Sequence, residues 1–375
     1  MSLLNKLFNR PQAHSAAPHL LISFCNLPPH VARYSLAVMD GNTNAFYFLK
    51  ADGVMAAEDI GITGIARTPD GGYALGIQSP NPRVVLLNHK LEFARSIALP
   101  QSHDIHSLIT YDNALIVTAT RSNEVYRLPL DSSDAEMIWS HPLSDGYLHL
   151  NCPMMWQNKL YVCAHRHPQL ASTDRSAPDD ESAAMGTIIN CTDNRIVATG
   201  LQQPHSLMAY GDGAMIASSF GGDVYTLSPD DLHSDTTLNL RERTPHIIMP
   251  DYIRGIAFND DTLYLGGSAR RIVSRKQGVT RRYVDDPFST LGDPRFHSNL
   301  YRINRANGQT ESVINMTALG FDIYDIMPLP SLPDASQLLS QPEILRAQAF
   351  RNILTVQEMS LNEYARAQSA QMENQ

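Results

Sequence analysis

Residues 104–128 read DIHSLITYDNALIVTATRSNEVYRL, and this stretch decides the fold. It divides into short segments rich in β-branched and aromatic residues, at 105–111, 114–121 and 123–128, and a similar segment follows at 135–140. Turn residues such as Asp112 and Asn113 separate the segments. Four short strands joined by tight turns are typical of a small antiparallel sheet.

The start of this stretch recurs along the chain. Each unit begins with a polar or cationic residue and continues into a small residue, an apolar stretch and a turn of Asp, Asn, Gln or Gly. The six beginnings are Thr63-Gly64-Ile65-Ala66, His106-Ser107-Leu108-Ile109, His149-Leu150-Asn151-Cys152, His205-Ser206-Leu207-Met208, Arg254-Gly255-Ile256-Ala257 and Tyr324-Asp325-Ile326-Met327. Their spacing of roughly 43 to 70 residues fits the four-stranded blades of a β-propeller.

The sixth unit has only its first strand, because it runs into Pro328 and Pro330. Three strand-like segments near the N-terminus, at about 20–26, 34–39 and 44–49, belong to no other unit. They would complete the sixth blade and remove the open edge that an incomplete blade exposes. We therefore predict an all-β fold, a six-bladed β-propeller spanning residues 19–332 and closed by N-terminal strands.

The two chain ends have a different character. Residues 1–18 predict a flexible N-terminal segment. In 333–375, Leu345, Ala349, Ile353 and Val356 repeat at helical spacing, which predicts a C-terminal α-helical extension. This helix either packs on the propeller or binds a protein partner. Segments 166–184 and 271–298 are irregular and read as loop insertions.

Composition excludes several classes of protein. The net charge of −9 argues against a general nucleic-acid binder. No stretch approaches the roughly 18 apolar residues of a membrane span. The four cysteines form no CxxC pair, so we predict buried free thiols in a reducing cytoplasm.

The innermost strand of each blade borders the central channel, so the unit beginnings predict one ring of side chains there. We call this the inner ring: Thr63, His106, His149, Asn151, His205, Arg254, Tyr324 and Asp325. The loops between second and third strands lie on the same face and form an outer ring of Arg121, His165, Arg166, His167, Arg270 and Arg271. His165 and His167 stand two residues apart, so on a strand they would face the same side, which is a weak signal of a metal site. The preferred interpretation is that both are surface loop residues.

The leading hypothesis is a ligand-binding or sensing propeller that holds a small anionic molecule at the channel mouth, since arginine forks suit carboxylate or phosphate. The predicted ligand-binding residues are His106, His149, Asn151, His205, Arg254, Tyr324, Arg121 and Arg270. The alternative for the arginines is that they pair with acids of the insertions.

A second hypothesis is a metal-dependent hydrolase or lyase. Histidine opens three of the six units, and imidazoles suit a divalent metal such as Zn, Fe or Mn. His106, His149 and His205 would hold the metal, and Asp325 would be the catalytic base. Alternatively, these histidines bond to backbone carbonyls and water. A third hypothesis is a protein-interaction scaffold.

Other catalytic signatures are absent from the sequence. It contains no GxSxG, P-loop, GxGxxG or HExxH motif. Ser107 and Ser206 directly follow histidines, but neighbours on a regular strand face opposite sides, so no Ser–His dyad is expected.

The units resemble a bacterial family of six-bladed propellers classed as a domain of unknown function. The likeness rests on residues 104–128, QPHSLMAYGDGAMIASSFGGDVY (203–225), IRGIAFNDDTLYLGGS (253–268) and FDIYDIMPLP (321–330). The layout is more distantly similar to gluconolactonase-like, NHL-type and strictosidine-synthase-like propellers. Metal enzymes of that group use Glu, Asn and Asp around calcium. Only Asn151 and Asp325 match such positions here, which disfavours a calcium lactonase.

Overall fold

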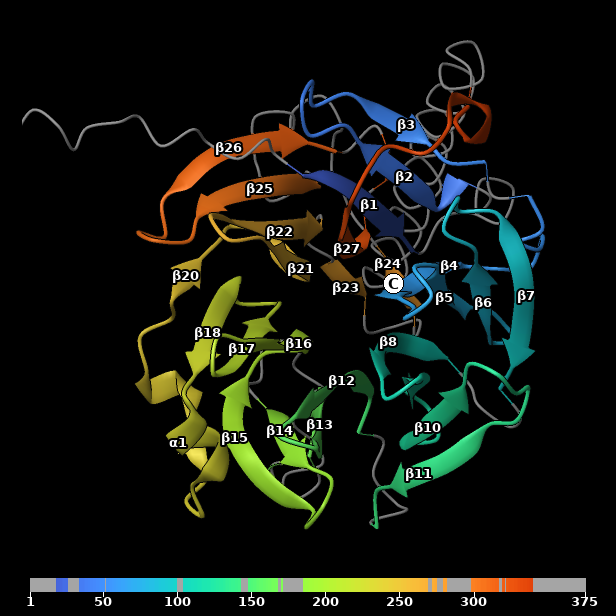
Figure 1. Cartoon of the computed structure of the whole chain (residues 1–375). Coiled ribbons are helices and arrows are strands. Elements are labelled where there is room, and N and C mark those ends of the chain that lie inside the picture. The colour runs from blue at the N-terminus through green and yellow to red at the C-terminus, as the bar shows by residue number, and fades with distance from the viewer. Residues whose placement is uncertain are drawn as a thin grey trace, which may run out of the picture.

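The computed structural model describes residues 18–25, 34–50, 52–99, 104–142, 148–167, 170, 185–268, 272–274, 279–281, 298–316, 319–320 and 322–339. In it, six antiparallel sheets stand around a common axis (Figure 1). The prediction of an all-β, six-bladed propeller is confirmed.

The blades follow one another along the chain, each from its innermost to its outermost strand. Blade 1 consists of β4 (Gly61–Arg67), β5 (Tyr73–Gln78), β6 (Arg83–Leu87) and β7 (Phe93–Ala98). Blade 2 consists of β8 (Ile105–Tyr111), β9 (Ala114–Ala119), β10 (Glu124–Pro129) and β11 (Glu136–Ser140). Blade 3 consists of β12 (Leu150–Trp156), β13 (Lys159–Ala164), β14 (Gly186–Asn190) and β15 (Arg195–Leu201), with β19 (Leu238–Asn239) added parallel to β15.

Blade 4 consists of β16 (Pro204–Tyr210), β17 (Gly213–Ser218), β18 (Asp223–Leu227) and β20 (Ile247–Ile248). The short helix α1 (Pro229–His233) follows β18. Blade 5 consists of β21 (Tyr252–Phe258), β22 (Thr262–Ser268), β25 (Asn299–Asn304) and β26 (Thr310–Asn315). Between β22 and β25 the chain forms the hairpin of β23 (Ile272–Ser274) and β24 (Val279–Arg281).

The sixth blade joins the two ends of the propeller. Its inner strand is β27 (Ile323–Leu329), followed by β1 (His19–Phe24), β2 (Leu36–Met39) and β3 (Phe46–Phe48). β1 pairs with both β27 and β2, so no strand of this blade is left without its neighbour. The predicted closure by N-terminal strands is confirmed.

Tight turns hold the strands of a blade in register. Asp112 and Asn113, between β8 and β9, have φ values of 47° and 52°. Gln157 and Asn158, between β12 and β13, have φ values of 48° and 60°. Two successive residues with positive φ form the hairpin turn whose twist matches that of the strands it joins.

The core lies between blades. In the described part of the chain, buried apolar side chains form six clusters, and each spans one pair of neighbouring blades. For example, Ile22 and Phe24 of blade 6 pack with Tyr264 and Leu300 of blade 5. Every blade therefore depends on both of its neighbours to bury its faces.

The chain ends lie mostly outside the described residues. Residues 335–337 form a short 3-10 helix, and Leu338 bridges to Leu49. The α-helical extension expected after 333 therefore does not begin in the described part, and residues 340–375 lie outside it. Residues 1–17, Arg270 and most of the expected insertions at 166–184 and 271–298 also lie outside it.

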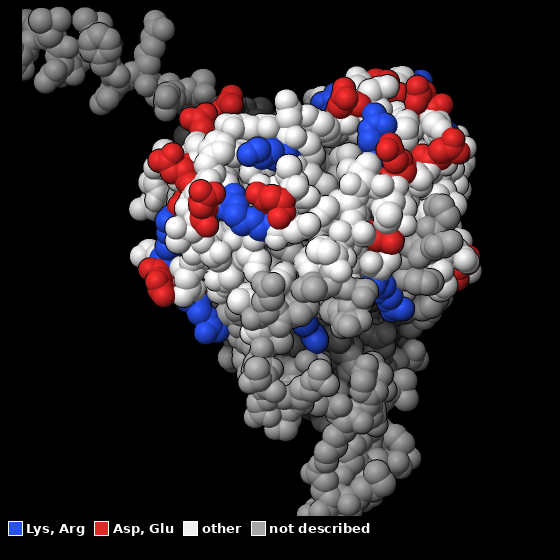
Figure 2. Space-filling model, turned by 90° about the horizontal axis from the view of Figure 1, so that it is seen from below, with Lys and Arg blue, Asp and Glu red and all other residues white. Residues whose placement is uncertain are grey.

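Two classes that the sequence excludes, general nucleic-acid binders and proteins with a membrane span, can be compared with the structure. Acidic and basic side chains lie interspersed on the described surface visible in Figure 2, without a continuous basic area. None of the helices in the described part has the length and hydropathy of a membrane span.

Replacing Ile22 by Ala tests the closing strand. Ile22 is 0% exposed in β1, so its truncation should lower the free energy of unfolding by about 2 to 4 kcal/mol. Val313→Ala, at a position that is 55% exposed in β26, should change it by about 0.5 kcal/mol or less. Urea denaturation measures both. Equal effects of the two substitutions would mean that closure through β1 does not support the fold.

Candidate functional site

All six inner strands depart from regular pairing at the inner ring. The register shifts lie between Ile62 and Gly64, Ile105 and Ser107, Leu150 and Pro153, His205 and Met208, Arg254 and Ile256, and opposite Tyr324. A bulge re-aims the side chains beside it. Consecutive residues consequently face the channel, whereas a regular strand would alternate them.

The bulged strands are joined to their neighbours by hydrogen bonds around the ring. At least one bond connects each pair of successive blades. Six of these bonds complete the ring: Thr63 Oγ1 to Ile105 O, Thr118 Oγ1 to Asn151 O, Asn151 Nδ2 to Pro204 O, Gly255 N to Ser206 Oγ, Ser268 Oγ to Ile323 O, and Ile65 N to Asp325 Oδ2. Two predicted site residues, Asn151 and Asp325, thus hold the blades together.

The structure brings the inner-ring histidines together. His106 Nε2 lies 3.1 Å from His149 Nε2, so one nitrogen donates a hydrogen bond to the other. The ring of His165 stacks on that of His149 at 4.0 Å and meets His205 edge-on at 5.2 Å. Burial, followed by the neighbouring His149 and His205, holds the pKa of His165 well below its usual value. The cluster therefore favours neutral rings.

Arg254 lies against the same cluster. Its guanidinium carbon is 4.7 Å from the centre of the Tyr252 ring and 4.8 Å from that of Tyr324. Asp322 Oδ2 lies 3.8 Å from Arg254 Nη1 and balances the charge. The two aromatic faces and the carboxylate offset part of the free-energy cost of burying this cation.

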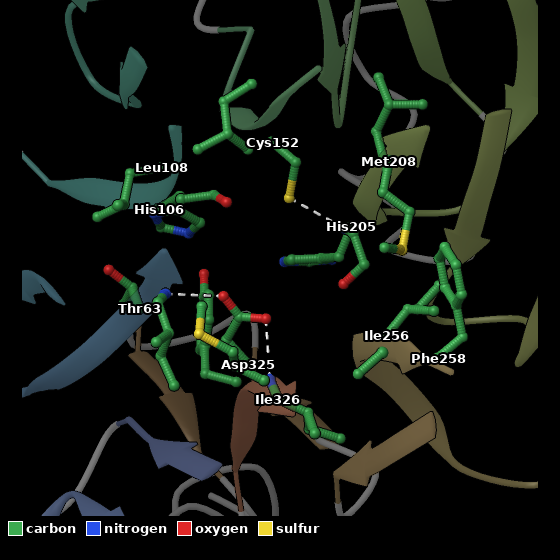
Figure 3. A pocket seen from close by; sticks show the side chains of 18 of the residues that line it. Thr63, His106, Leu108, Cys152, His205, Met208, Ile256, Phe258, Asp325 and Ile326 are labelled. Carbon is green, nitrogen blue, oxygen red and sulfur yellow. Dashed lines mark hydrogen bonds between the residues drawn. The ribbon is translucent and has the colours of Figure 1, made fainter. Parts of the chain in front are cut away.

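A cavity of about 300 Å³ extends from the histidine cluster along the inner strands (Figure 3). Its polar wall contains Thr63, His106, Cys152, His205, Tyr324 and Asp325. Its apolar wall includes Leu108, Met208, Ile256, Phe258 and Ile326. His149, Asn151 and Arg254 do not belong to the described lining. The space available to a ligand therefore lies along the channel beyond the histidine pair.

Several buried polar atoms have no hydrogen-bond partner among the described residues. They include Nε2 of His205, the hydroxyl of Tyr324, and Nε and Nη1 of Arg254. His205 is 2% exposed and Arg254 is 3% exposed. Unsatisfied buried groups cost free energy, so each one calls for a ligand or water.

The orientation of His205 is determined by its other nitrogen. Nδ1 lies 2.9 Å from the carbonyl oxygen of Gln203 and 2.9 Å from Ser219 Oγ. The carbonyl can only accept, so Nδ1 carries the hydrogen, and Nε2 of the neutral ring is an acceptor. Burial, followed by repulsion from Arg254, keeps the pKa of His205 well below its usual value.

A carboxyl group flanks His106 on its other side. Asp104 Oδ1 lies 3.7 Å from His106 Nδ1 and also accepts a hydrogen bond from Gln78 Nε2. Burial raises the pKa of Asp104, and the hydrogen bond from Gln78 lowers it in part. This carboxyl group was not predicted, because it precedes β8 and lies outside the repeated positions.

Not all predicted residues join the cluster. Arg121 lies exposed in the turn between β9 and β10 and does not line the cavity. Arg270 lies outside the described residues. The expectation that His167 is a surface residue is wrong: it is 3% exposed and its ring meets that of His141 at 5.3 Å. β13 ends at Ala164, so the alternation of a strand no longer relates His165 to His167.

The bulges also change the expectation that Ser107 and Ser206 face away from the histidines that precede them. Ser107 and Ser206 line the cavity together with the histidines that precede them. Ser206 Oγ nevertheless accepts the amide of Gly255, which gives it a structural role between blades 4 and 5.

A search of the described residues finds no group of three or more His, Cys, Asp or Glu side chains arranged to hold a metal ion. The predicted set of His106, His149 and His205 remains a hypothesis.

The pH dependence of stability should report on Asp325. Both its oxygens accept backbone amides, from Ile65 and Ile326, but burial raises its pKa to about 7. The folded state then binds a proton that the unfolded state releases at about pH 4, so stability is lost as the pH rises toward 7. Asp325→Asn removes this loss.

We expect the free energy of unfolding of Asp325→Asn, relative to the wild type, to rise by at least about 1.4 kcal/mol between pH 5 and pH 8. Asp70→Asn is the control, because hydrogen bonds from Thr68 and Gly72 lower the pKa of that carboxyl group. Its effect should be the same at both pH values. Parallel pH profiles of Asp325→Asn and wild type would contradict the assignment.

Comparisons with known proteins support the fold. A search of curated proteins finds no match. A chain of the nidogen–laminin complex is similar at a TM-score of 0.52 and 10% identity, covering 82% of this chain and 97% of that one. A Bacteroides caccae protein of unknown function matches at a TM-score of 0.51 and 12% identity, covering 84% of this chain and 100% of its own. At these identities the likeness concerns the fold alone.

The sequence itself carries a family signature. The domain of unknown function DUF4915 matches residues 88–338, which include five of the six inner strands. The matched segment contains His106, His149, His205, Arg254 and Tyr324, so the histidine cluster lies within it. The chain therefore belongs to the DUF4915 family of proteins, and its fold is a six-bladed β-propeller.

Proposed function

We propose that this propeller is a ligand-binding protein that holds a small carboxylate in its central cavity. The observation that carries the proposal is the combination of a 300 Å³ cavity with the partnerless Nε2 of His205 and hydroxyl of Tyr324 in its wall. Ligand pockets are mainly apolar with a few polar groups that orient the ligand, and this cavity has that composition.

The chemistry of these groups favours an acid. The Tyr324 hydroxyl can donate to one carboxylate oxygen. His205 Nε2 is an acceptor in the neutral ring, so it pairs with the other oxygen by taking up one proton together with the ligand. Arg254 lies behind the Tyr324 ring and supplies a positive field in a region shielded from water. Electrostatic attraction is strong in such a region. The apolar wall would then hold the body of the ligand.

Matched acids and amides test the proposal. Binding of benzoate and hexanoate, and of benzamide and hexanamide, is measured by titration calorimetry on the full chain. We expect the wild type to bind the carboxylates at least about 10-fold more tightly than the amides, the difference that about 1.4 kcal/mol provides. Arg254→Gln should lose this preference, because the positive field is gone.

Arg121→Gln is the control for charge. It removes an exposed arginine that does not line the cavity, so the preference for the acids should persist. Equal affinity of acids and amides in the wild type, or equal effects of the two arginine substitutions, would contradict the proposal. Circular dichroism of each variant verifies that it is folded.

A metal-dependent hydrolase or lyase is the second candidate. The observation that favours it is the 3.1 Å separation of His106 Nε2 and His149 Nε2. Two imidazole nitrogens at about this distance can bind one zinc ion with bonds of about 2.0–2.1 Å. His205 is the third predicted ligand, and Asp325 would act as the base.

Elemental analysis of the dialysed, untagged protein distinguishes the two candidates. The metal hypothesis predicts about one equivalent of zinc, iron or manganese, and its loss in His106→Ala and His149→Ala. His233→Ala, on α1, is the matched control and should keep the metal. A metal content near zero after reconstitution would leave the carboxylate proposal alone.

The third hypothesis, a protein-interaction scaffold, uses the disc face and the C-terminal helix. Residues 340–375 of the expected helical segment lie outside the described residues.

A further inference from the structure

Cys152 lines the cavity, and neither candidate function uses this residue. It lies in the bulge of β12, is 7% exposed, and directs its sulfur toward the blade of His205 (Figure 3). The backbone amide of Ser206 donates a hydrogen bond to this sulfur at 3.0 Å. A backbone donor aimed at a sulfur atom stabilises its thiolate form.

A second cysteine, Cys163, lies beside Cys152. Cys163 of β13 is buried, and its sulfur lies 3.4 Å from the backbone nitrogen of Cys152. The neighbouring Cys163 lowers the pKa of Cys152, whereas burial raises the pKa of Cys163 itself. Cys152 is the member of the pair whose sulfur accepts the Ser206 amide, and it is the one that lines the cavity.

The cavity also holds the groups that an addition to a carbonyl compound requires. The Tyr324 hydroxyl, without a described partner, can donate to an oxygen on which negative charge develops. Asp325 lines the same cavity and, with a pKa of about 7, can take up and return a proton near neutral pH. A thiolate, an oxyanion donor and a proton carrier thus share about 300 Å³.

We propose that Cys152 is a nucleophilic site for small α,β-unsaturated carbonyl compounds that enter the channel. The Cys152 sulfur forms a bond to the β-carbon while the carbon–carbon π pair shifts toward the carbonyl oxygen, where the Tyr324 hydroxyl stabilises it. The enolate then takes a proton at the α-carbon. The thiol loses one proton to Asp325 and the α-carbon gains one from it, so the product is a thioether and no oxidant is needed.

This inference goes beyond the binding of a carboxylate and does not depend on it. Arg254 has no part in the addition, and the carboxylate proposal does not use Cys152. Both proposals use the Tyr324 hydroxyl, but their deciding tests, the acid preference that Arg254 provides and the reactivity of Cys152, can fail separately.

The relative reaction rates of the cysteines test whether Cys152 is the nucleophile. The full-length native protein is treated at pH 7 with N-ethylmaleimide, which adds by conjugate addition, and modification of each cysteine is followed by peptide mass spectrometry. Cys191 is more exposed than Cys152, but burial raises its pKa. We expect Cys152 to react at least about 10-fold faster than Cys191, and Cys163→Ser to slow Cys152 several-fold. Faster reaction of Cys191 would overturn the proposal.

A second reagent tests the role of Tyr324. Iodoacetamide alkylates a thiolate by displacement, without forming an enolate. Tyr324→Phe should therefore slow the maleimide reaction of Cys152 about 5- to 10-fold and leave the iodoacetamide reaction unchanged. Equal slowing of both reagents would overturn the assignment of the oxyanion donor.

Whether the cavity stabilises the enolate can also be tested without a variant. The ratio of maleimide to iodoacetamide rates at Cys152 is measured in the native protein and again in urea, where the cavity is lost. A higher ratio in the native protein supports the proposal, and an unchanged ratio overturns it.

Discussion

The closed ring of hydrogen bonds between neighbouring blades is the constraint on which the rest of the structure depends. Each of the six bonds crosses from one blade to the next, and several use the atoms that bulge out of regular pairing. A bulge removes one ladder bond and frees a backbone group that must be satisfied elsewhere. The neighbouring blade satisfies it, so the distortion of every strand is stabilised by the next one.

This constraint explains why polar side chains lie so deep in the molecule. The inner strands approach one another closely, and their bulges turn consecutive residues toward the axis. Histidine tolerates such a place because its ring is neutral when burial lowers its pKa. Arg254 remains charged, and Asp322 and the faces of Tyr252 and Tyr324 surround it. The site therefore combines one compensated cation with several neutral bases.

Much of the fold could be predicted from the sequence because the blade is a local pattern that repeats. The strands at 105–111 and 135–140 were located to within one residue. The need to complete the last blade predicted the N-terminal closure. The same repetition brought His106, His149, His205, Arg254 and Tyr324 together, since equivalent positions of a propeller converge on its axis.

What the sequence did not reveal lies where the repeat is broken. His165 follows the end of β13 and enters the cluster from the adjacent strand. Cys152 and the two serines face the cavity only because of bulges, which leave no mark in a hydrophobic pattern. Asp104 precedes its strand. Asn151 has a structural role that its residue type does not reveal, because its amide donates to Pro204 O.

The bulge at the start of every inner strand has an evolutionary consequence. Side chains of the neighbouring blade, such as Thr63, Asn151 and Asp325, satisfy the backbone groups that the bulges free, whereas His205, Arg254 and Tyr324 take no part in these bonds. The latter positions are thus separate variables: His205, Arg254 and Tyr324 open equivalent units with very different side chains. Substitution in one blade can change what the channel recognises while the other five stay as they are. A propeller of this kind can acquire new ligands by single steps, and its fold alone does not reveal which ligand a relative binds.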